Sequence, residues 1–471
     1  MGSDVAAVHS QASFWQSVRE SITGSQQDYT EGSIGRAITL LSIPMVLEMS
    51  MESLFGIVDV FFVGWLGSNA VATVGLTESL LTIVFGAALG LSMATTAMVA
   101  RRVGEKNHEA AAVATVQGIA LGLVLSVVTG IIGSIWAKPL LRVMGASSEL
   151  VDSGWGYTAW ILGGGGTAVM LIVINSVFRG AGAPVVAMRA LWLANIINII
   201  LDPCLIFGFG PFPELGIAGA AVATTIGRGI GVVYLLRVLT TGSSRIVVRR
   251  SQIRLDMPVL KPLLRVSIPG MFQWFVATAS YVGLTRILST FGGAALAGYT
   301  VALRIIVVVI LPAWGMSNAA STLVGQNLGA GKPERAERSV WVTGFANMVF
   351  LGLISLWFIF WPEPVIRLFN NDPEVVPIGA DCLRLVSYGY VFYAFGMVIV
   401  QAFNGAGDTR TPTIINVFCY WLWQIPLAWW LAMHAGLGAR GVFWAIAIAE
   451  STIAVVGVVI FRRGRWKLQR I

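Results

Sequence analysis

The chain has 471 residues, of which 56% are hydrophobic and only 11% are charged, and its mean hydropathy is +0.78. Because about a quarter of the residues in a soluble globular domain are charged, this composition excludes that class and indicates a membrane protein. The formal net charge is +8. We assign it to membrane topology and anionic lipid headgroups, and we expect no nucleic-acid partner.

Twelve apolar stretches are long enough to cross a bilayer as helices. In the first half of the chain they lie near residues 38–65, 70–99, 110–136, 155–178, 186–207 and 216–238. In the second half they lie near residues 262–290, 294–323, 338–361, 381–403, 411–434 and 437–461. The predicted fold class is therefore an all-α polytopic membrane protein with six spans in each half. The first 35 residues are polar, so no cleavable signal peptide is expected.

The second half of the chain repeats the first at a constant offset of 225 residues. Ser42-Ile43-Pro44 returns as Ser267-Ile268-Pro269, and the Phe-x-Gly-Ala-Gly motif at Phe178 returns at Phe403. Two homologous halves in so apolar a chain predict a transporter that works at the interface between them. We expect a mobile cytoplasmic arm, an N-lobe, a cytoplasmic linker, a C-lobe and a basic cytoplasmic tail, at residues 1–34, 35–240, 241–260, 261–462 and 463–471.

Lysine and arginine are distributed unevenly over the predicted loops. If both termini are cytoplasmic, 23 of the 31 basic residues fall in cytoplasmic segments and 4 in outside loops. This distribution follows the positive-inside rule and predicts a multi-pass protein of the cell membrane with both termini inside the cell. Because each half has an even number of spans, both halves enter the membrane from the same side, and the repeat is parallel.

Five acidic residues lie within the predicted spans of the first half: Glu48, Glu52, Asp59, Glu78 and Asp202. Ionisable groups inside a bilayer are costly, and they therefore mark functional sites by default. The first three are spaced i, i+4 and i+11, which places them within roughly 40° of one face of a helix. The alternative interpretation is a set of structural carboxylates that neighbouring hydroxyls and arginines satisfy.

The positions of these acids along their spans predict that several share one layer of the membrane. Counted from the predicted outside turns at roughly 1.5 Å per residue, Asp59, Glu78, Asp202 and Thr224 lie at similar depth in the outer half. Asn198 lies one turn before Asp202 and shares its helix face. The proline after Asp202 frees a backbone carbonyl that would suit ion coordination, and a simple kink is the alternative.

The second half keeps the scaffold but loses the acids. At the 225-residue offset, Glu48, Glu52, Asp59 and Glu78 are replaced by Gln273, Ala277, Leu284 and Leu303. Glu450 in the last span is the exception, and we interpret it as a structural partner. The sequence contains no phosphate-binding loop, no His-Glu-x-x-His pair and no Gly-x-Ser-x-Gly motif, which disfavours an intramembrane enzyme. An ion gradient is therefore expected to drive transport, unless transport is passive.

A family resemblance is carried by Ile43-Pro44, Val58-Asp59-x-Phe61-x-Val63-Gly64, Phe178-Arg-Gly-x-Gly, Asn198-x-x-x-Asp202-Pro203 and Gly219-Ala220-Ala221-x-Ala223-Thr224. From about residue 35 to 462 the chain resembles the multidrug and toxic compound extrusion (MATE) transporters, most closely their prokaryotic DNA-damage-inducible-type branch. The resemblance implies two six-helix bundles arranged as a V, and proton- or sodium-coupled antiport of organic cations.

The same resemblance implies roles for individual residues. It assigns ion coupling to Asp59 and Asp202, with Asn198 and Thr224 as their hydrogen-bonding partners. It also places Asn175 in the wall of the same cavity. Glu52 departs from the family pattern, because that branch usually has glutamine at this position.

We therefore predict a proton-driven antiporter that exports amphiphilic, cationic small molecules as a monomer in the lipid bilayer, without a cofactor or a metal site. Sodium is the alternative coupling ion, and flipping of a lipid-linked precursor is the alternative function. The predicted ion-coupling residues are Asp59, Asp202, Asn198, Thr224 and Glu52. The predicted substrate-binding residues are Glu48, Glu52, Glu78 and Asn175.

Overall fold

The computed structural model describes residues 14–24, 27–242 and 245–471, which form helices and connecting turns without any strand. The first half contains α1 (Phe14–Thr23), α2 (Ile34–Gly64), α3 (Ser68–Gly104), α4 (His108–Val143), α5 (Ser148–Gly163), α6 (Gly166–Gly180), α7 (Pro184–Phe207) and α8 (Ile217–Thr241). Residues 1–13 and 25–26 of the predicted arm and 243–244 of the predicted linker lie outside the described part of the chain.

The second half follows the short 3₁₀ helix η1 (Arg250–Gln252). It contains α9 (Met257–Leu288), η2 (Ser289–Phe291), α10 (Gly293–Gly329), α11 (Pro333–Phe360), α12 (Pro362–Arg367), α13 (Val375–Ser387) and α14 (Tyr390–Ala406). It ends with α15 (Arg410–Asn416), the π-helical η3 (Val417–Gln424), α16 (Ile425–Trp429), the π-helical η4 (Trp430–His434), α17 (Ala439–Arg462) and η5 (Arg465–Leu468).

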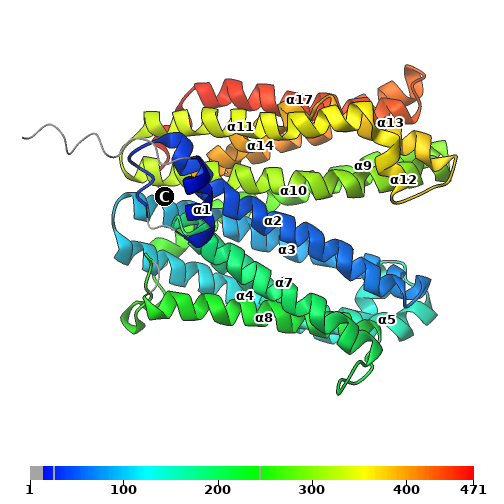
Figure 1. The fold of residues 1–471 in the computed structure, drawn as a ribbon, viewed down its shortest axis with the longest axis horizontal. Coiled ribbons are helices and arrows are strands. Elements are labelled where there is room, and N and C mark those ends of the chain that lie inside the picture. The colour runs from blue at the N-terminus through cyan, green and yellow to red at the C-terminus, as the bar shows by residue number, and fades with distance from the viewer. Residues whose placement is uncertain (1–13, 25–26, 243–244) are drawn as a thin grey trace, which may run out of the picture.

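These helices make the twelve crossings that the sequence predicts, in two bundles that lie along the long axis of the molecule (Figure 1). Within the described residues, nine helical stretches, or ten with the bent α13–α14 pair, are long and apolar enough to cross a membrane. The acid-bearing α2 and its counterpart α9 complete the twelve. The predicted all-α fold class is thus confirmed.

Two crossings are broken rather than continuous. In the fourth crossing, α5 and α6 are separated at Gly164 and Gly165, and a Cβ on Gly164 would lie 2.4 Å from the Thr225 hydroxyl of α8. Glycine is required at this contact because a larger residue would push the break away from α8. In the tenth crossing, α13 and α14 bend by 57°. The break in the fourth crossing positions α6 and α8 around the candidate site.

The lobes meet where α3 and α10 pack backbone to backbone. A Cβ on Gly104 would lie 2.0 Å from the Gln326 carbonyl oxygen, and a Cβ on Gly329 would lie 2.1 Å from that of Arg101. Gly104 corresponds to Gly329 in the repeat, and Arg101 corresponds to Gln326. The same contact therefore occurs twice about the pseudo-twofold axis. Arg101 also donates to a carbonyl of α14 at 3.3 Å, and Gln326 donates to a carbonyl of α6 at 2.9 Å.

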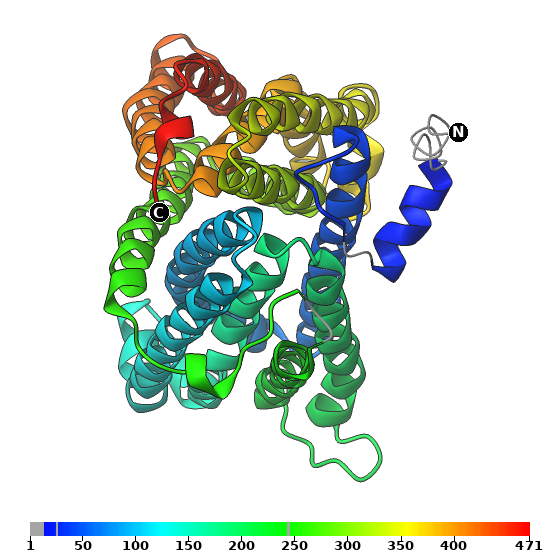
Figure 2. The ribbon, with the colours of Figure 1, turned by 90° about the vertical axis from the view of Figure 1, so that its left-hand side faces the viewer.

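This contact lies at the end of the molecule that also holds α1 and the C-terminal residues, which we call the terminal end (Figures 1 and 2). A mobile arm is predicted over residues 1–34, but its described part between α1 and α2 is anchored to the C-lobe. The Arg335 guanidinium donates to the carbonyls of Tyr29, Glu31 and Gly32 at 3.2, 2.8 and 2.9 Å. These bonds satisfy backbone groups that a free arm would leave to water.

The basic tail is also held in place. Lys467 forms an ion pair with Glu337 at 2.5 Å. Arg101 of the N-lobe donates to the Gln469 carbonyl at 3.0 Å. The C-terminal segment therefore reaches from its own lobe to the other, as the N-terminal segment does.

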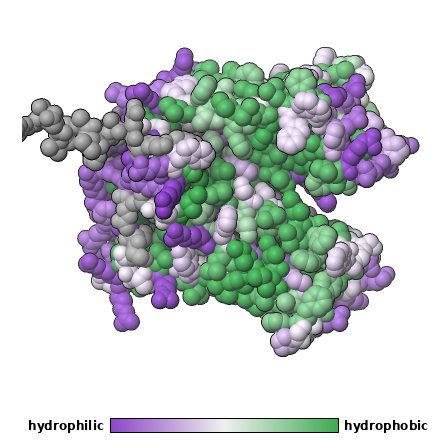
Figure 3. Space-filling model, in the orientation of Figure 1, coloured by the Kyte–Doolittle hydropathy of each residue, from purple (hydrophilic) through white to green (hydrophobic). Residues whose placement is uncertain are grey.

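The surface separates into an apolar belt and polar ends. Figure 3 shows hydrophobic side chains around the middle of the bundle and hydrophilic ones at both ends, as expected of a membrane-spanning protein. At the end opposite the terminal end, which we call the far end, a notch divides the two lobes (Figure 3). The lobes are thus joined at one end and separate at the other.

A valine at position 104 should weaken the joined end. Its side chain would overlap the carbonyl of Gln326, which belongs to a helix backbone, so we expect Gly104→Val to lower stability by roughly 1–3 kcal/mol. Thermal unfolding of the purified protein in detergent measures this effect. Gly75→Val is the matched control, because Gly75 lies in the same helix and a Cβ there meets nothing within 4 Å. Equal unfolding midpoints for the two variants would contradict this interpretation.

Candidate functional site

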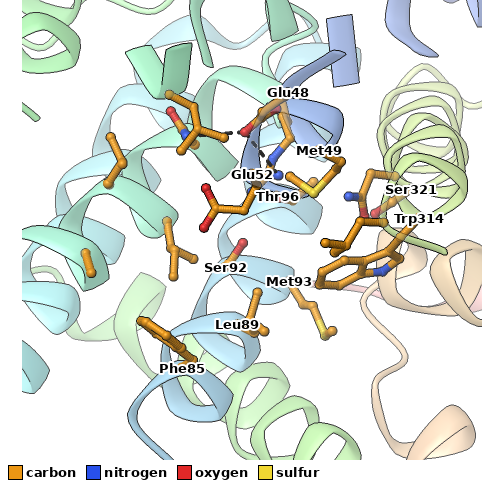
Figure 4. Close-up of a pocket in the computed structure, with 18 of the residues that line it drawn as sticks. Glu48, Met49, Glu52, Phe85, Leu89, Ser92, Met93, Thr96, Trp314 and Ser321 are labelled. Atoms are coloured by element: carbon orange, nitrogen blue, oxygen red, sulfur yellow. Dashed lines mark hydrogen bonds and ion pairs between the residues drawn. The ribbon is translucent and has the colours of Figure 1, made fainter. Parts of the chain in front are cut away.

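A central cavity of about 210 Å³ lies between the lobes, lined by helices of both. The N-lobe contributes Met49 and Met93, and the C-lobe contributes Trp274 and Trp314, whose rings stack with centroids 5.8 Å apart. Figure 4 shows Trp314 across the cavity from Glu52, whose carboxylate points into the open space. Aromatic and thioether side chains of this kind suit apolar, flat ligands.

The deeper of two acids in the central cavity is Glu48, whose side chain is 1% exposed. Its Oε1 lies 3.6 Å from the Arg179 guanidinium and accepts a hydrogen bond from the Asn175 amide at 3.3 Å. Asn175, predicted to line a substrate cavity, therefore lines the central cavity and holds Glu48. A carboxylate buried to this degree needs such partners, because an unpaired buried charge is strongly destabilising.

The second acid, Glu52, is more accessible. Its Oε1 lies 3.3 Å from the Arg228 guanidinium, its Oε2 accepts from the Asn195 amide at 3.2 Å, and its side chain is 33% exposed. The Arg228 guanidinium lies near the rings of Phe55 and Phe85, 5.5 and 5.8 Å from their centroids. Aromatic faces stabilise a cation in this position.

A second cavity of about 350 Å³ lies inside the N-lobe and is lined by Asp59, Glu78 and Thr224. Glu52 and Arg228 line both this N-lobe cavity and the central cavity, so the pair forms the wall between the two. Glu78, predicted to bind substrate, lines the N-lobe cavity and is not part of the central one.

Asp202 lies behind this wall and is fully buried. The Asn198 amide donates to the Asp202 carboxylate at 3.3 Å and to the Thr224 hydroxyl at 3.0 Å. Asn198 and Thr224 thus connect the buried Asp202 to the cavity that Asp59 lines. The structure therefore brings the predicted ion-coupling residues into one region of the N-lobe.

The C-lobe contains a cavity at the same place in the repeat. Nine residues that line the N-lobe cavity have counterparts at the 225-residue offset that line the C-lobe cavity: Gly56 and Tyr281, Glu78 and Leu303, Leu81 and Ile306, Phe85 and Ile310, Ile161 and Val386, Gly164 and Gly389, Gly165 and Tyr390, Ala168 and Tyr393, Thr225 and Glu450. The C-lobe cavity is only about 30 Å³, because three tyrosines replace two glycines and an alanine. Its single acid, Glu450, accepts a hydrogen bond from Tyr420 at 3.2 Å.

Comparison with known proteins identifies the family that has this architecture. The model of the MatE family matches residues 44–204 and 269–430, one segment in each lobe. The chain belongs to the MatE family. It is 29% identical over 448 residues to a probable multidrug resistance protein NorM of Thermotoga maritima, covering 93% of this chain and 94% of that protein. It is 25% identical to an FAD transporter of Shewanella oneidensis, covering 90% and 93% of the two chains.

Among solved structures, the chain resembles an outward-facing MATE-family multidrug resistance transporter, with a TM-score of 0.87 and 27% identity over 93% of this chain and 98% of the other. The predicted resemblance to the MATE family is confirmed. A MatE protein is a transporter, not an enzyme, and uses no bound cofactor. Within the described residues, no group of three or more His, Cys, Asp or Glu side chains could hold a metal ion.

The residues of the central cavity that were not predicted from the sequence include Arg179, Arg228, Trp274 and Trp314. For Arg228 a signal existed, because a basic residue inside an apolar span is as costly as an acidic one. The two tryptophans carried no such signal, since the chain contains 17 and most could face lipid.

Removing the Asn198 amide should destabilise the N-lobe. In Asn198→Ala, Asp202 loses its hydrogen-bond donor while fully buried, so we expect a loss of about 1–3 kcal/mol. Thr224→Val is the control, because it removes an acceptor of the same amide and leaves the donor to Asp202 in place. Thermal unfolding should rank wild type above Thr224→Val and Thr224→Val above Asn198→Ala. An Asn198→Ala variant as stable as wild type would refute the role of this amide.

Proposed function

We propose that the protein is a cation-coupled antiporter that exports amphiphilic small molecules by alternating access. The observation that carries this proposal is the shared wall of Glu52 and Arg228, which links a cavity between the lobes to a cavity with carboxylates inside one lobe. A membrane protein with a ligand cavity in contact with titratable groups has what exchange of a ligand for an ion requires. The multidrug resistance names of its relatives support this function.

We further propose that the terminal end faces the cytoplasm. The distribution of lysine and arginine supports this orientation, because the basic linker and tail lie at that end. The notch at the far end then opens to the outside, so the lobes are joined on the cytoplasmic side. This arrangement is the one expected after substrate release to the exterior.

Protons are proposed as the coupling ion, with Asp59 and Asp202 as the residues that bind them. A sodium site requires several converging oxygen ligands, whereas a proton requires one carboxylate. The bond from Asn198 presents an N–H donor to Asp202, and the second carboxylate oxygen of Asp202 is buried without a hydrogen-bond partner in the described residues. A charge at that oxygen is costly and protonation removes it. This local chemistry favours a proton over a metal ion.

The coupling ion can be tested in proteoliposomes. We expect an imposed pH gradient without sodium to drive movement of a fluorescent cationic dye, and an imposed sodium gradient at equal pH to have no effect. Protein-free liposomes control for passive movement of the dye. Transport that follows sodium and ignores the pH gradient would assign the coupling to sodium instead.

Replacing either aspartate by asparagine should abolish coupled transport, because asparagine keeps the size of the side chain but cannot exchange a proton. We expect Asp59→Asn and Asp202→Asn to reduce dye transport by about tenfold or more while the purified proteins remain folded. Gln273→Ala, at the position in the C-lobe that corresponds to Glu48, is expected to have a much milder effect. If Gln273→Ala is the inactive variant, the coupling residues lie in the other lobe.

A further inference from the structure

The charges of the central cavity do not single out cations over other ligands. Among the described residues that line it, the acidic and basic ones are Glu48, Glu52, Arg179 and Arg228. Each carboxylate forms an ion pair with one guanidinium. The lining is therefore neutral when all four groups are charged. A cavity that selects simple organic cations is expected to carry an excess of negative charge.

The two ion pairs differ in how readily a ligand could reach them. The Glu48 side chain is 1% exposed and is also held by Asn175, so this pair forms part of the protein core. The Glu52 side chain is 33% exposed, and its ion pair with Arg228 is a single contact at 3.3 Å rather than a two-bond fork. The Nε of Arg228 is buried without a hydrogen-bond partner in the described residues. A ligand in the cavity cannot reach this buried atom. The single contact nevertheless leaves Arg228 with terminal N–H donors beyond the one bonded to Glu52, and the exposure of Glu52 leaves its carboxylate open to the cavity.

A ligand with one positive charge can satisfy only half of the pair between Glu52 and Arg228. If its positively charged group takes the carboxylate, the guanidinium, which is 11% exposed and lies near two phenylalanine rings, loses its partner. An unpaired charge in such surroundings is strongly unfavourable. A ligand that also carries a carboxylate can pair with both residues at once. No buried charge is then left without a partner.

We propose that the preferred substrates are zwitterionic aromatic molecules, whose positively charged group pairs with Glu52 and whose carboxylate pairs with Arg228. Trp314 lies across the cavity from Glu52 (Figure 4) and stacks with Trp274, so the two rings provide the surface for the flat aromatic part. Met49 and Met93 provide adaptable apolar contacts. This inference rests on the proposed function, because it names the substrate class of the same cavity. It makes Arg228 a residue that determines specificity.

A matched pair of dyes tests this inference through binding alone. Tetramethylrhodamine free acid is a zwitterion, and its methyl ester is a cation with the same ring system. Fluorescence anisotropy with purified full-length protein in detergent should show the free acid binding at least about tenfold more tightly than the ester. Arg228→Gln should abolish this preference by weakening the free acid about tenfold and leaving or improving the ester. Arg286→Gln, an exposed arginine of α9 outside the cavity, is the control and should preserve the preference.

Arg228→Lys is a second variant that keeps the test valid if Arg228→Gln does not fold. It keeps the positive charge and should retain part of the preference for the free acid. The inference is overturned if wild type binds the ester as tightly as the free acid, if it binds neither dye, or if Arg228→Gln weakens both dyes equally. These results are distinct from failure of the proposed function. A protein that prefers the free acid but moves neither dye under any ion gradient would refute antiport and leave the assigned ligand class standing.

Discussion

The close approach of α3 and α10 is the constraint on which the rest of the architecture depends. Gly104 and Gly329 bring each helix against the backbone of the other, and the repeat places this contact twice about one axis. Because the close contacts between the lobes run from the terminal end only to about the middle of α2 and α3, the far ends of the lobes diverge, and the central cavity is the space between them. A state open at the terminal end must separate this contact, since helices packed backbone to backbone leave no passage between the lobes.

The two lobes share positions but differ in chemistry. Gly56, Gly165 and Ala168 leave room in the N-lobe for a cavity of about 350 Å³ with several acids at its wall. Tyrosines at the corresponding C-lobe positions reduce the cavity to about 30 Å³. Small side chains therefore matter as much as the acids themselves, because the space that they leave gives Asp59 access to the cavity. This asymmetry supports the proposal that ion coupling belongs to the N-lobe.

The sequence was sufficient to predict the twelve helices, the two lobes and the family, because apolar runs and a constant offset depend only on residue order. The grouping of Asp59, Asn198, Asp202 and Thr224 also followed, since depth along a helix is set by residue number. The pairing of Glu52 with Arg228 did not follow, because it depends on how far α2 and α8 rotate about their axes. The anchoring of the predicted arm could not be predicted either, since Arg335, which binds it, belongs to the C-lobe and is far from the arm in the sequence.

The pair of Glu52 and Arg228 connects the two proposals made for this protein. Both residues line the central cavity and the cavity that contains Asp59. A ligand that pairs with them separates Glu52 from Arg228 and so changes the electrostatic field at Asp59, and a proton on Asp59 changes the charge facing Arg228. Each event therefore alters the free energy of the other, and by linkage the two effects are equal in size. Because the ion pair itself is shared, this coupling does not require a long chain of intervening contacts, and it links substrate choice and ion coupling at one place in the fold.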